Sequence, residues 1–235
     1  MPKHIGIVAC SAEGAALCYR TIAAEGASVM GEHDHPEVSL HCYSLAEYMK
    51  PIYRDDWKGV GSLMLSSAKK LKRIGADLLI CPDNTVHQAL PFIRAQSPLP
   101  WLHIAEVVAE KALEKGYKKL GITGTKYLVE SEVYPEKLRQ RGVEFVRPSA
   151  EDREETNRII FEELVYGVFK PEGVKYFQQV IERLKQLGCD AVILGCTEIP
   201  LIINETNSPL PTLDSTRLLA RAALEHALET APLQV

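Results

Sequence analysis

The sequence has no cluster of basic residues, no stripe of aromatic residues among them and no long hydrophobic run. Its 27 Lys and Arg residues are outnumbered by 31 Asp and Glu residues, which gives a formal net charge of −4. Proteins dedicated to nucleic-acid binding carry basic patches, so we expect no nucleic-acid partner. Because no stretch of 18 apolar residues occurs, we also expect no membrane-spanning helix.

Paired cysteines are also missing. None of the cysteines forms a CxxC pair; they are Cys10, Cys18, Cys42, Cys81, Cys189 and Cys196. The apolar run near the N-terminus is too short for the core of a signal peptide, and Glu13 interrupts it. Free thiols without a secretion signal are typical of the reducing cytoplasm, so we expect a cytoplasmic protein.

Motifs for common cofactors are absent too. The segment GITGTK at 121–126 lacks the spacing of a phosphate-binding loop, and no GxGxxG follows the first apolar run. His33, His35 and His41 lie close together in the sequence but lack a fourth ligand at a spacing typical of metal sites. We therefore expect neither a metal ion nor a cofactor.

The composition is that of an ordinary globular protein, with 46% hydrophobic and 25% charged residues. Short apolar runs alternate with longer segments such as 57–75, in which apolar residues recur every three or four positions. This pattern predicts an α/β protein in which mostly parallel strands are buried between helices. The predicted strands cover residues 5–10, 38–43, 78–81, 101–104, 120–123, 143–146, 191–194 and 211–213.

An internal repeat divides the chain into two halves. The segments that align are 70–85 with 183–198, 97–114 with 208–225, and 5–11 with 120–126. Three matches in the same order, at nearly equal offsets, indicate two homologous halves of about 115 residues, close to the size of a small domain. We predict a first α/β domain formed by 1–98 plus 210–235 and a second formed by 99–209, with a final helix near 214–229 packed on the first.

The repeat pairs Asp83 with Cys196. Each follows a buried strand, precedes an apolar segment that can begin a helix, and has small polar residues beside it. Loops at the carboxyl ends of parallel strands commonly bind ligands, and N–H groups at a helix start bind carboxylates and lower the pKa of thiols. When two homologous halves face each other, their equivalent loops meet. We therefore predict an active site in the interdomain cleft, with Asp83 and Cys196 facing each other.

The motifs around these residues resemble the PLP-independent aspartate/glutamate racemase family. The similar segments are GCTEIPL at 195–201, DNTVH at 83–87, GTKY at 124–127, IIFEEL at 159–164, VFKPE at 168–172 and LDST at 213–216. The resemblance spans nearly the whole chain and implies two pseudo-symmetric, flavodoxin-like α/β domains with parallel sheets. It also implies a cysteine from each domain at the substrate Cα, where one thiolate removes a proton and the other thiol returns one to the opposite face.

This sequence departs from the family at the first cysteine, where Asp83 stands. Cys81 lies two residues earlier, roughly 6.6 Å back along a strand, and we expect it to be buried, as free cysteines usually are. Reference pKa values of about 3.9 for Asp and about 8.5 for Cys predict a resting carboxylate and thiol. Racemisation would then be slow or biased towards one enantiomer. The alternative is that Asp83 only caps a helix.

Further residues are candidates for binding the substrate. Ser11 and Thr125 hold nearly equivalent places in the two halves, and with Asn84, Thr85 and Thr197 they are expected to offer hydroxyl and N–H groups to a carboxylate. The resemblance implies this contact for the region of Thr125, and the prediction extends it to the equivalent positions.

For each of three further candidates, a structural explanation stands beside the functional one. The resemblance matches Lys170 to a lysine that recognises the distal carboxylate of the substrate in related racemases, whereas lysines in loops are mostly solvated. Glu198 either contacts the substrate amine or is a first-turn carboxylate of a helix. His87 follows Asp83 by one turn and either hydrogen bonds near the site or lies on a helix surface.

Together, these features predict a cofactor-independent racemase or epimerase that acts on aspartate or glutamate through Asp83 and Cys196. Its partner would be a small amino acid or dicarboxylate, and the resemblance implies a homodimer. One alternative is a one-base lyase or decarboxylase acting on a related dicarboxylic acid. The other is a catalytically silent carboxylate-binding protein, which would not exchange the Cα proton of an amino acid.

Overall fold

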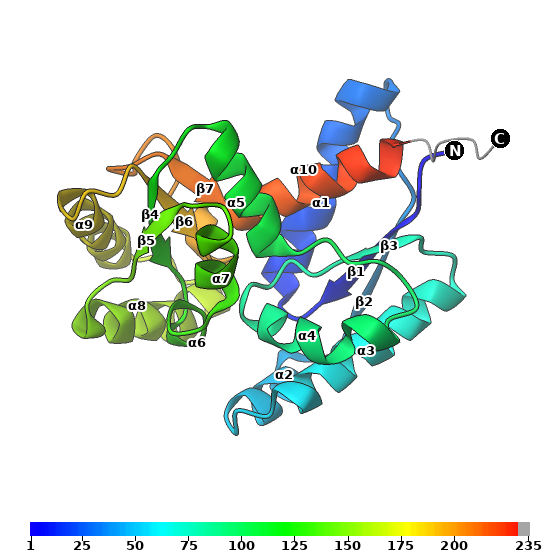
Figure 1. The fold of residues 1–235 in the computed structure, drawn as a ribbon, viewed down its shortest axis with the longest axis horizontal. Coiled ribbons are helices and arrows are strands. Elements are labelled where there is room, and N and C mark those ends of the chain that lie inside the picture. The colour runs from blue at the N-terminus through cyan, green and yellow to red at the C-terminus, as the bar shows by residue number, and fades with distance from the viewer. Residues whose placement is uncertain (230–235) are drawn as a thin grey trace. The chain divides into compact units, whose positions relative to one another are not determined.

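The computed structural model describes residues 1–229, which form two compact α/β units (Figure 1). Of the described residues, the first unit contains Met1–Ile104 and 216–229, and the second contains Ala105–Ser215. Every pair of neighbouring strands in both sheets is parallel. The α/β fold with parallel sheets that the sequence predicts is therefore confirmed.

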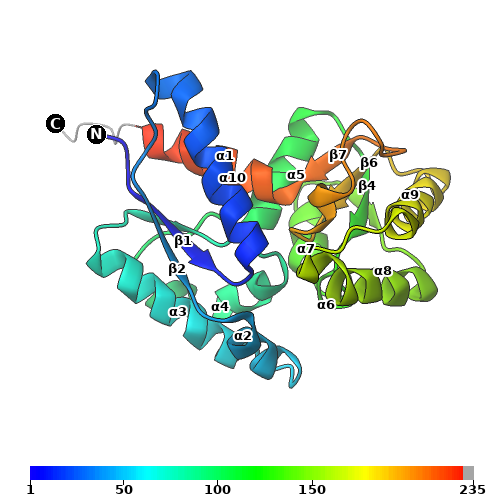
Figure 2. The ribbon, with the colours of Figure 1, turned by 180° about the vertical axis from the view of Figure 1, so that it is seen from behind.

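The first unit is built on a three-stranded sheet in the order β2-β1-β3. Its elements are β1 (Ile5–Ala9), α1 (Ala12–Met30), β2 (Val38–Cys42), α2 (Leu45–Ile52), α3 (Trp57–Arg73), β3 (Leu78–Ile80), η1 (Thr85–Ala89), α4 (Leu90–Ile93), η2 (Arg94–Gln96) and α10 (Ser215–Leu228). In both views of the ribbon, α1 and α10 lie on one side of this sheet and α2, α3 and α4 lie on the other (Figure 2). All residues of β1 and β3 are buried, as expected for strands covered by helices on both faces.

The second unit is built on a four-stranded sheet in the order β5-β4-β6-β7. Its elements are α5 (Ile104–Glu114), β4 (Lys119–Thr123), α6 (Lys126–Val129), α7 (Val133–Arg139), β5 (Glu144–Val146), α8 (Ala150–Glu162), η3 (Leu164–Tyr166), α9 (Pro171–Gln186), β6 (Ala191–Leu194), η4 (Ile199–Leu201) and β7 (Thr212–Asp214). A buried cluster that includes Ile159, Phe177 and Val192 joins α8, α9 and β6 into one core.

The internal repeat is also a repeat of strand register. Ile5 pairs with Leu78 in the first sheet, and Leu120 pairs with Ala191 in the second, so the pairs occupy the places that the sequence alignment assigns to them. The bridge that Trp101 makes beside β3 corresponds in the same way to the pairing of β7 with β6. The pseudo-symmetry of the two halves therefore extends to individual backbone pairs.

One predicted strand is wrong. The segment 101–104 is not a strand, because only Trp101 forms a bridge, to Leu79, and α5 begins at Ile104. Leu79 donates its N–H to the carbonyl of Pro100 and accepts one from Leu102, which completes a single parallel bridge. Beyond that bridge the chain enters helix α5, which begins at the buried Ile104. Apolar content alone does not distinguish the start of a buried helix from a short strand.

The helix ends follow from local sequence. Ser11 caps α1 by accepting from the N–H of Gly14, and Asp56 caps α3 by accepting from Gly59. Helix α9 begins with Pro171, which lacks the N–H that the first helical position leaves unpaired. Among the described helices, none is long and apolar enough to cross a membrane.

Helix α10 belongs to the first unit, together with the N-terminal part of the chain. The carbonyl of Ala227 accepts a hydrogen bond from the N–H of Lys3 at 2.8 Å. Arg221 forms an ion pair with Glu25 on α1 at 2.8 Å. The hydrogen bonds of that pair lower the pKa of the Glu25 carboxyl.

Candidate active site

The turn after β6 depends on a glycine. Gly195 donates its N–H to the carbonyl of Thr123 at 2.9 Å, which brings the ends of β4 and β6 together. A Cβ atom at Gly195 would lie 2.5 Å from that carbonyl oxygen, closer than real Cβ contacts allow. The glycine of the GCTE motif therefore permits the close backbone approach that sets the position of Cys196.

Cys196, Thr197 and Glu198 form one hydrogen-bonded group. The Cys196 Sγ donates to Glu198 Oε2 at 2.9 Å, and the Thr197 hydroxyl donates to the same oxygen at 2.7 Å. Glu198 is 4% exposed, whereas Cys196 is partly exposed. The buried Glu198 side chain thus accepts the S–H hydrogen bond of Cys196, a residue that remains partly exposed. A thiol in this position can donate a proton. The Glu198 carboxylate can accept a proton that the thiol passes on to it.

Thr125 follows β4 at the same end of the sheet at which Cys196 follows β6. Thr123 pairs with Leu194, and two residues beyond that pair lie Thr125 and Cys196. The Thr125 side chain caps α6 by accepting from the N–H of Leu128 at 3.4 Å, and the residue is 7% exposed. The second unit therefore brings together Thr125, Cys196, Thr197 and Glu198 at the carboxyl end of its sheet.

Asp83 has the corresponding place in the first unit. It follows β3 and is partly exposed, and its Oδ1 accepts from the N–H of Val86 at 3.3 Å. That bond is of the capping type, so the capping alternative describes part of its role. A cap bond to one oxygen leaves the carboxylate able to accept a proton.

The cysteines near Asp83 are buried thiols. Cys81 is fully buried, as predicted, and burial followed by the charge of Asp83 raises the pKa of its thiol. Cys10 is 3% exposed, and the same two causes raise the pKa of its thiol. Both cysteines therefore stay protonated at neutral pH. His87 is buried as well, with Nε2 3.0 Å from the carbonyl oxygen of Cys81.

The remaining candidates of the first unit lie at the same end of its sheet. Asn84 is 2% exposed and precedes η1, which begins at the partly exposed Thr85. Ser11 is partly exposed and accepts from the N–H of Gly14 at 3.3 Å, at the start of α1. The loops after β1 and β3 thus place Ser11, Asp83, Asn84 and Thr85 at the carboxyl edge of one sheet.

Lys170 also lies in the second unit. It precedes α9, its side chain is 53% exposed, and its ammonium lies 3.4 Å from Glu163 Oε1. Glu163 is buried and also pairs with Arg158 at 3.1 Å. The structure therefore gives Lys170 an ion-pair partner on its own unit, which a substrate carboxylate would have to replace.

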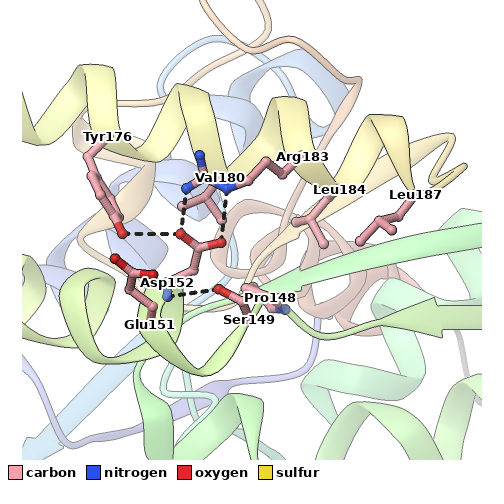
Figure 3. Close-up of a pocket in the computed structure, with 9 residues that line it drawn as sticks. All are labelled: Pro148, Ser149, Glu151, Asp152, Tyr176, Val180, Arg183, Leu184 and Leu187. Atoms are coloured by element: carbon pink, nitrogen blue, oxygen red, sulfur yellow. Dashed lines mark hydrogen bonds and ion pairs between the residues drawn. The ribbon is translucent and has the colours of Figure 1, made fainter.

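A pocket between α8 and α9 holds a second set of charged residues (Figure 3). Arg183 forms a two-point ion pair with Asp152, and the hydroxyl of Tyr176 donates to the same carboxylate at 3.1 Å. Burial acts to raise the pKa of Asp152, but the hydrogen bonds from Arg183, Ser149 and Tyr176 prevail and lower it. These groups satisfy one another, which is the arrangement of a structural ion pair.

No group of three potential metal ligands occurs within residues 1–229. Within the same range, which includes every cysteine of the chain, no disulfide is formed.

The sequence patterns do not single out Cys10, and for Glu198 they predict only a substrate contact or a place in the first turn of a helix. The repeat contains a signal for Cys10, because IGIVACS at 5–11 aligned with LGITGTK at 120–126 places Cys10 on Thr125, a residue that was already a candidate. The contact of Glu198 with Cys196 has no comparable signal, since a glutamate two residues after a cysteine can point in many directions.

Comparisons with known proteins identify a matching family and similar solved structures. A family model described as Asp/Glu/Hydantoin racemase matches residues 7–223. A putative Asp/Glu racemase from Yersinia pestis is 32% identical, with 97% of this chain and 100% of that chain covered and a TM-score of 0.88. An aspartate racemase homologue from Pyrococcus horikoshii OT3 is 30% identical, with 97% and 100% covered and a TM-score of 0.84.

A curated relative is the broad specificity amino-acid racemase RacX of Bacillus subtilis (strain 168). It is 24% identical over 196 residues, which cover 81% of this chain and 82% of that protein.

Proposed function

The chain belongs to the Asp/Glu/hydantoin racemase family, and from that premise we propose that it inverts the Cα centre of an acidic amino acid without a cofactor. The observation that carries the proposal is the accessible thiol of Cys196, which donates to the buried carboxylate of Glu198 at 2.9 Å. A thiol held in its protonated form by a carboxylate is suited to deliver a proton to carbon.

Inversion needs a second group that acts on the other face of Cα, and we assign that role to Asp83. Its carboxylate takes the Cα proton, and the electron pair of the C–H bond passes into the planar carbanion. The thiol of Cys196 then donates its proton to the opposite face and becomes a thiolate. The reverse reaction begins from a protonated Asp83 and a Cys196 thiolate, so each turnover in one direction must be followed by proton exchange.

The two groups are not matched in acidity. Reference pKa values of about 3.9 for Asp and about 8.5 for Cys differ by ~4.6 units, which corresponds to ~6 kcal/mol between the two protonation arrangements. The resting state is therefore carboxylate plus thiol. This state removes the proton only from the enantiomer whose Cα hydrogen points at Asp83, so catalysis is faster in one direction at low conversion.

Substrate binding is assigned to the polar groups around these two residues. Hydroxyl and N–H groups of Ser11, Asn84, Thr85, Thr125 and Thr197 are proposed to hold the α-carboxylate. Lys170 is proposed to bind the distal carboxylate of aspartate or glutamate, in exchange for its contact with Glu163. The curated relative from Bacillus subtilis is described as having broad specificity, so the preference for acidic substrates rests on Lys170.

The test is the rate of inversion of aspartate and glutamate, followed by polarimetry or chiral chromatography. We expect Cys196→Ser to lower the rate at least a hundredfold, because a serine hydroxyl is a far weaker acid than a thiol. Asp83→Asn should abolish inversion of the enantiomer that Asp83 deprotonates. Asp83→Cys should bring the two directions closer to parity, because it gives both faces a thiol.

Cys189→Ala is the matched control. It removes a thiol at the opposite end of β6, where burial raises the pKa of Cys189 to about 11. Its rate should equal that of the native protein. An Asp83→Cys variant with unchanged rate and unchanged asymmetry would show that Asp83 is not the base. The proposed homodimer of the 26.1 kDa chain is tested separately by size-exclusion chromatography with light scattering.

A further inference from the structure

The turns that follow β3 and β6 are held by different hydrogen bonds. In the second unit the pairing of β4 with β6 runs to Thr123 and Leu194, and Gly195 donates its N–H to the carbonyl of Thr123 at 2.9 Å. In the first unit the pairing of β1 with β3 ends at Ile7 and Ile80, which is one position earlier in the alignment of the repeat. The turn of the first unit therefore begins after one strand pair fewer.

A proline accounts for the shorter pairing. The alignment of 70–85 with 183–198 places Pro82 where the second unit has Gly195. Proline has no backbone N–H, so the bond that closes the turn before Cys196 cannot form before Asp83. Another donor is required if the turn of the first unit is to be held as firmly.

The side chain of His87 supplies a donor. Its Nε2 lies 3.0 Å from the carbonyl oxygen of Cys81, the residue that the repeat aligns with Leu194. A carbonyl oxygen only accepts, so the hydrogen of this bond is on Nε2. In the second unit the carbonyl of Leu194 accepts from the hydroxyl of Ser215 at 2.8 Å. Both units therefore bond the carbonyl at this position with a side chain, and in the first unit the bond closes a loop that contains Asp83.

The imidazole of His87 is fixed by its surroundings. The residue is 1% exposed, and its ring packs edge to face against that of the buried His103, with the centroids 4.6 Å apart. A hydrogen bond shielded from water in this way is stronger than one at the surface. The backbone N–H of His87 also donates to the carbonyl of Asn84 at 3.2 Å. His87 thus bonds to the turn at Cys81 and at Asn84, on either side of Asp83.

We propose that His87 is a positioning residue for Asp83: its Nε2–H, bonded to the Cys81 carbonyl, replaces the backbone bond that Pro82 cannot make. This inference rests on the proposed function for its catalytic consequence. Proton transfer from carbon requires the reacting atoms to be held about 3 to 3.5 Å apart, so a turn that moves more freely lowers the rate. The role of His87 is to hold the turn, and it exchanges no proton with the substrate.

The first measurement uses the native protein and depends neither on activity nor on the folding of a variant without the donor. Long-range proton–nitrogen-15 NMR correlations show which nitrogen of each imidazole carries a hydrogen. The resonances of His87 are identified by their absence in His87→Gln. We expect a hydrogen on Nε2 of His87 at neutral pH. A ring with hydrogen on Nδ1 alone would overturn the inference, because Nε2 could not then donate to the Cys81 carbonyl.

The second measurement separates the donor from the volume of the side chain. His87→Gln keeps an N–H donor, whereas His87→Met has a side chain of similar length without one, and both lose the ring contact with His103. We expect the backbone amides at positions 86 and 87 to exchange their hydrogens about tenfold faster in His87→Met than in His87→Gln, the effect of one buried hydrogen bond. Equal exchange in the two variants would overturn the inference.

His35→Met is the matched control. It removes an imidazole whose Nδ1 lies 2.8 Å from the carbonyl oxygen of Pro36. His35 is in the same unit but precedes β2, whereas Asp83 follows β3 at the opposite end of the parallel sheet. Amide exchange at positions 86 and 87 should match that of the native protein. Exchange as fast as in His87→Met would indicate a general loss of stability and would overturn the inference.

The kinetic measurement links the bond to catalysis. Misplacing a reacting group by about 1 Å can lower a rate about a hundredfold, so we expect kcat for inversion to fall about ten- to hundredfold in His87→Met and to stay within about threefold of the native value in His87→Gln. Equally low values in both variants would contradict a role for the donor, as would a native value in His87→Met. No inversion by the native protein would contradict the proposed function, and the two NMR measurements would then decide whether His87 holds the turn.

Discussion

Glu198→Gln separates two roles that the structure allows for the buried Glu198 side chain beside Cys196, the thiol proposed to be catalytic. The substitution keeps the volume of the side chain and one carbonyl oxygen but removes the negative charge. Glu198 Oε2 accepts from both Cys196 and Thr197, at 2.9 and 2.7 Å, and Glu198 is 4% exposed. If Glu198 acts on the thiol, the change affects proton transfer. If it binds the substrate amine, the change affects substrate affinity.

The size of the effect follows from the loss of one charged acceptor. A hydrogen bond to a charged group contributes about 1.5 to 3 kcal/mol and one between neutral groups about 0.5 to 1.5, so the difference for the Cys196 bond is roughly 1 to 1.5 kcal/mol. Since about 1.4 kcal/mol corresponds to a factor of ten in rate, we expect kcat to fall about five- to tenfold. KM should stay within about a factor of two.

The assay is steady-state inversion of both enantiomers of aspartate by Glu198→Gln, with Glu205→Gln as the control. Glu205 is exposed and lies in the same unit, and its replacement should change neither constant. A rise in KM with native kcat would refute the reasoning and assign Glu198 to the substrate amine. Native values of both constants would deny it any role in the reaction.

Three further predictions follow from contacts outside this pair. Asp152→Asn should destabilise the native state by about 1 to 3 kcal/mol at pH 7 in urea titrations, because the buried Asp152 carboxylate then no longer accepts the hydrogen bonds of Arg183 and Tyr176 as a charged group. The lowered pKa of Asp152 means that its contribution is present above the unfolded-state pKa and is lost as the pH falls through the folded one, so the difference between native and variant should vanish in acid. Lys170→Ala should weaken the binding of acidic substrates by about 1.5 to 3 kcal/mol and that of neutral ones hardly at all, whereas equal losses in KM assays would indicate a structural role through Glu163. Gly195→Ala should lower both kcat and the melting temperature, because its Cβ would lie 2.5 Å from the carbonyl oxygen of Thr123, and a fully active variant would contradict the close approach.

The repeat and the strand positions could be predicted because both follow from local patterns in the sequence. Buried parallel strands such as β1 and β6 appear as short apolar runs, and their homologous neighbours align without gaps. The segment 101–104 has the same apolar character but is held by one bridge before a helix begins. The conformation of this segment depends on its single bridge to Leu79, and the local sequence pattern does not reveal that contact.

The chemical partners of the candidate residues could be predicted only in part. The carboxyl-end placement of Asp83 and Cys196 follows from the motif positions. The influence of Asp83 on the Cys10 thiol does not, because the two residues follow different strands, β1 and β3, whose pairing the motif positions do not give. The choice between a substrate contact and a thiol contact for Glu198 likewise depends on a side-chain direction that spacing leaves open.

The central claim is that this chain moves the Cα proton of an acidic amino acid, and proton NMR in D₂O tests it most directly. Each enantiomer of aspartate and glutamate is incubated with the native protein, with Cys196→Ser and with Cys189→Ala. The account predicts loss of the Cα proton signal with the native protein and Cys189→Ala, faster for one enantiomer than for its mirror image, and almost none with Cys196→Ser. An unchanged Cα signal for all four amino acids with the native protein, its thiols kept reduced, would contradict the account.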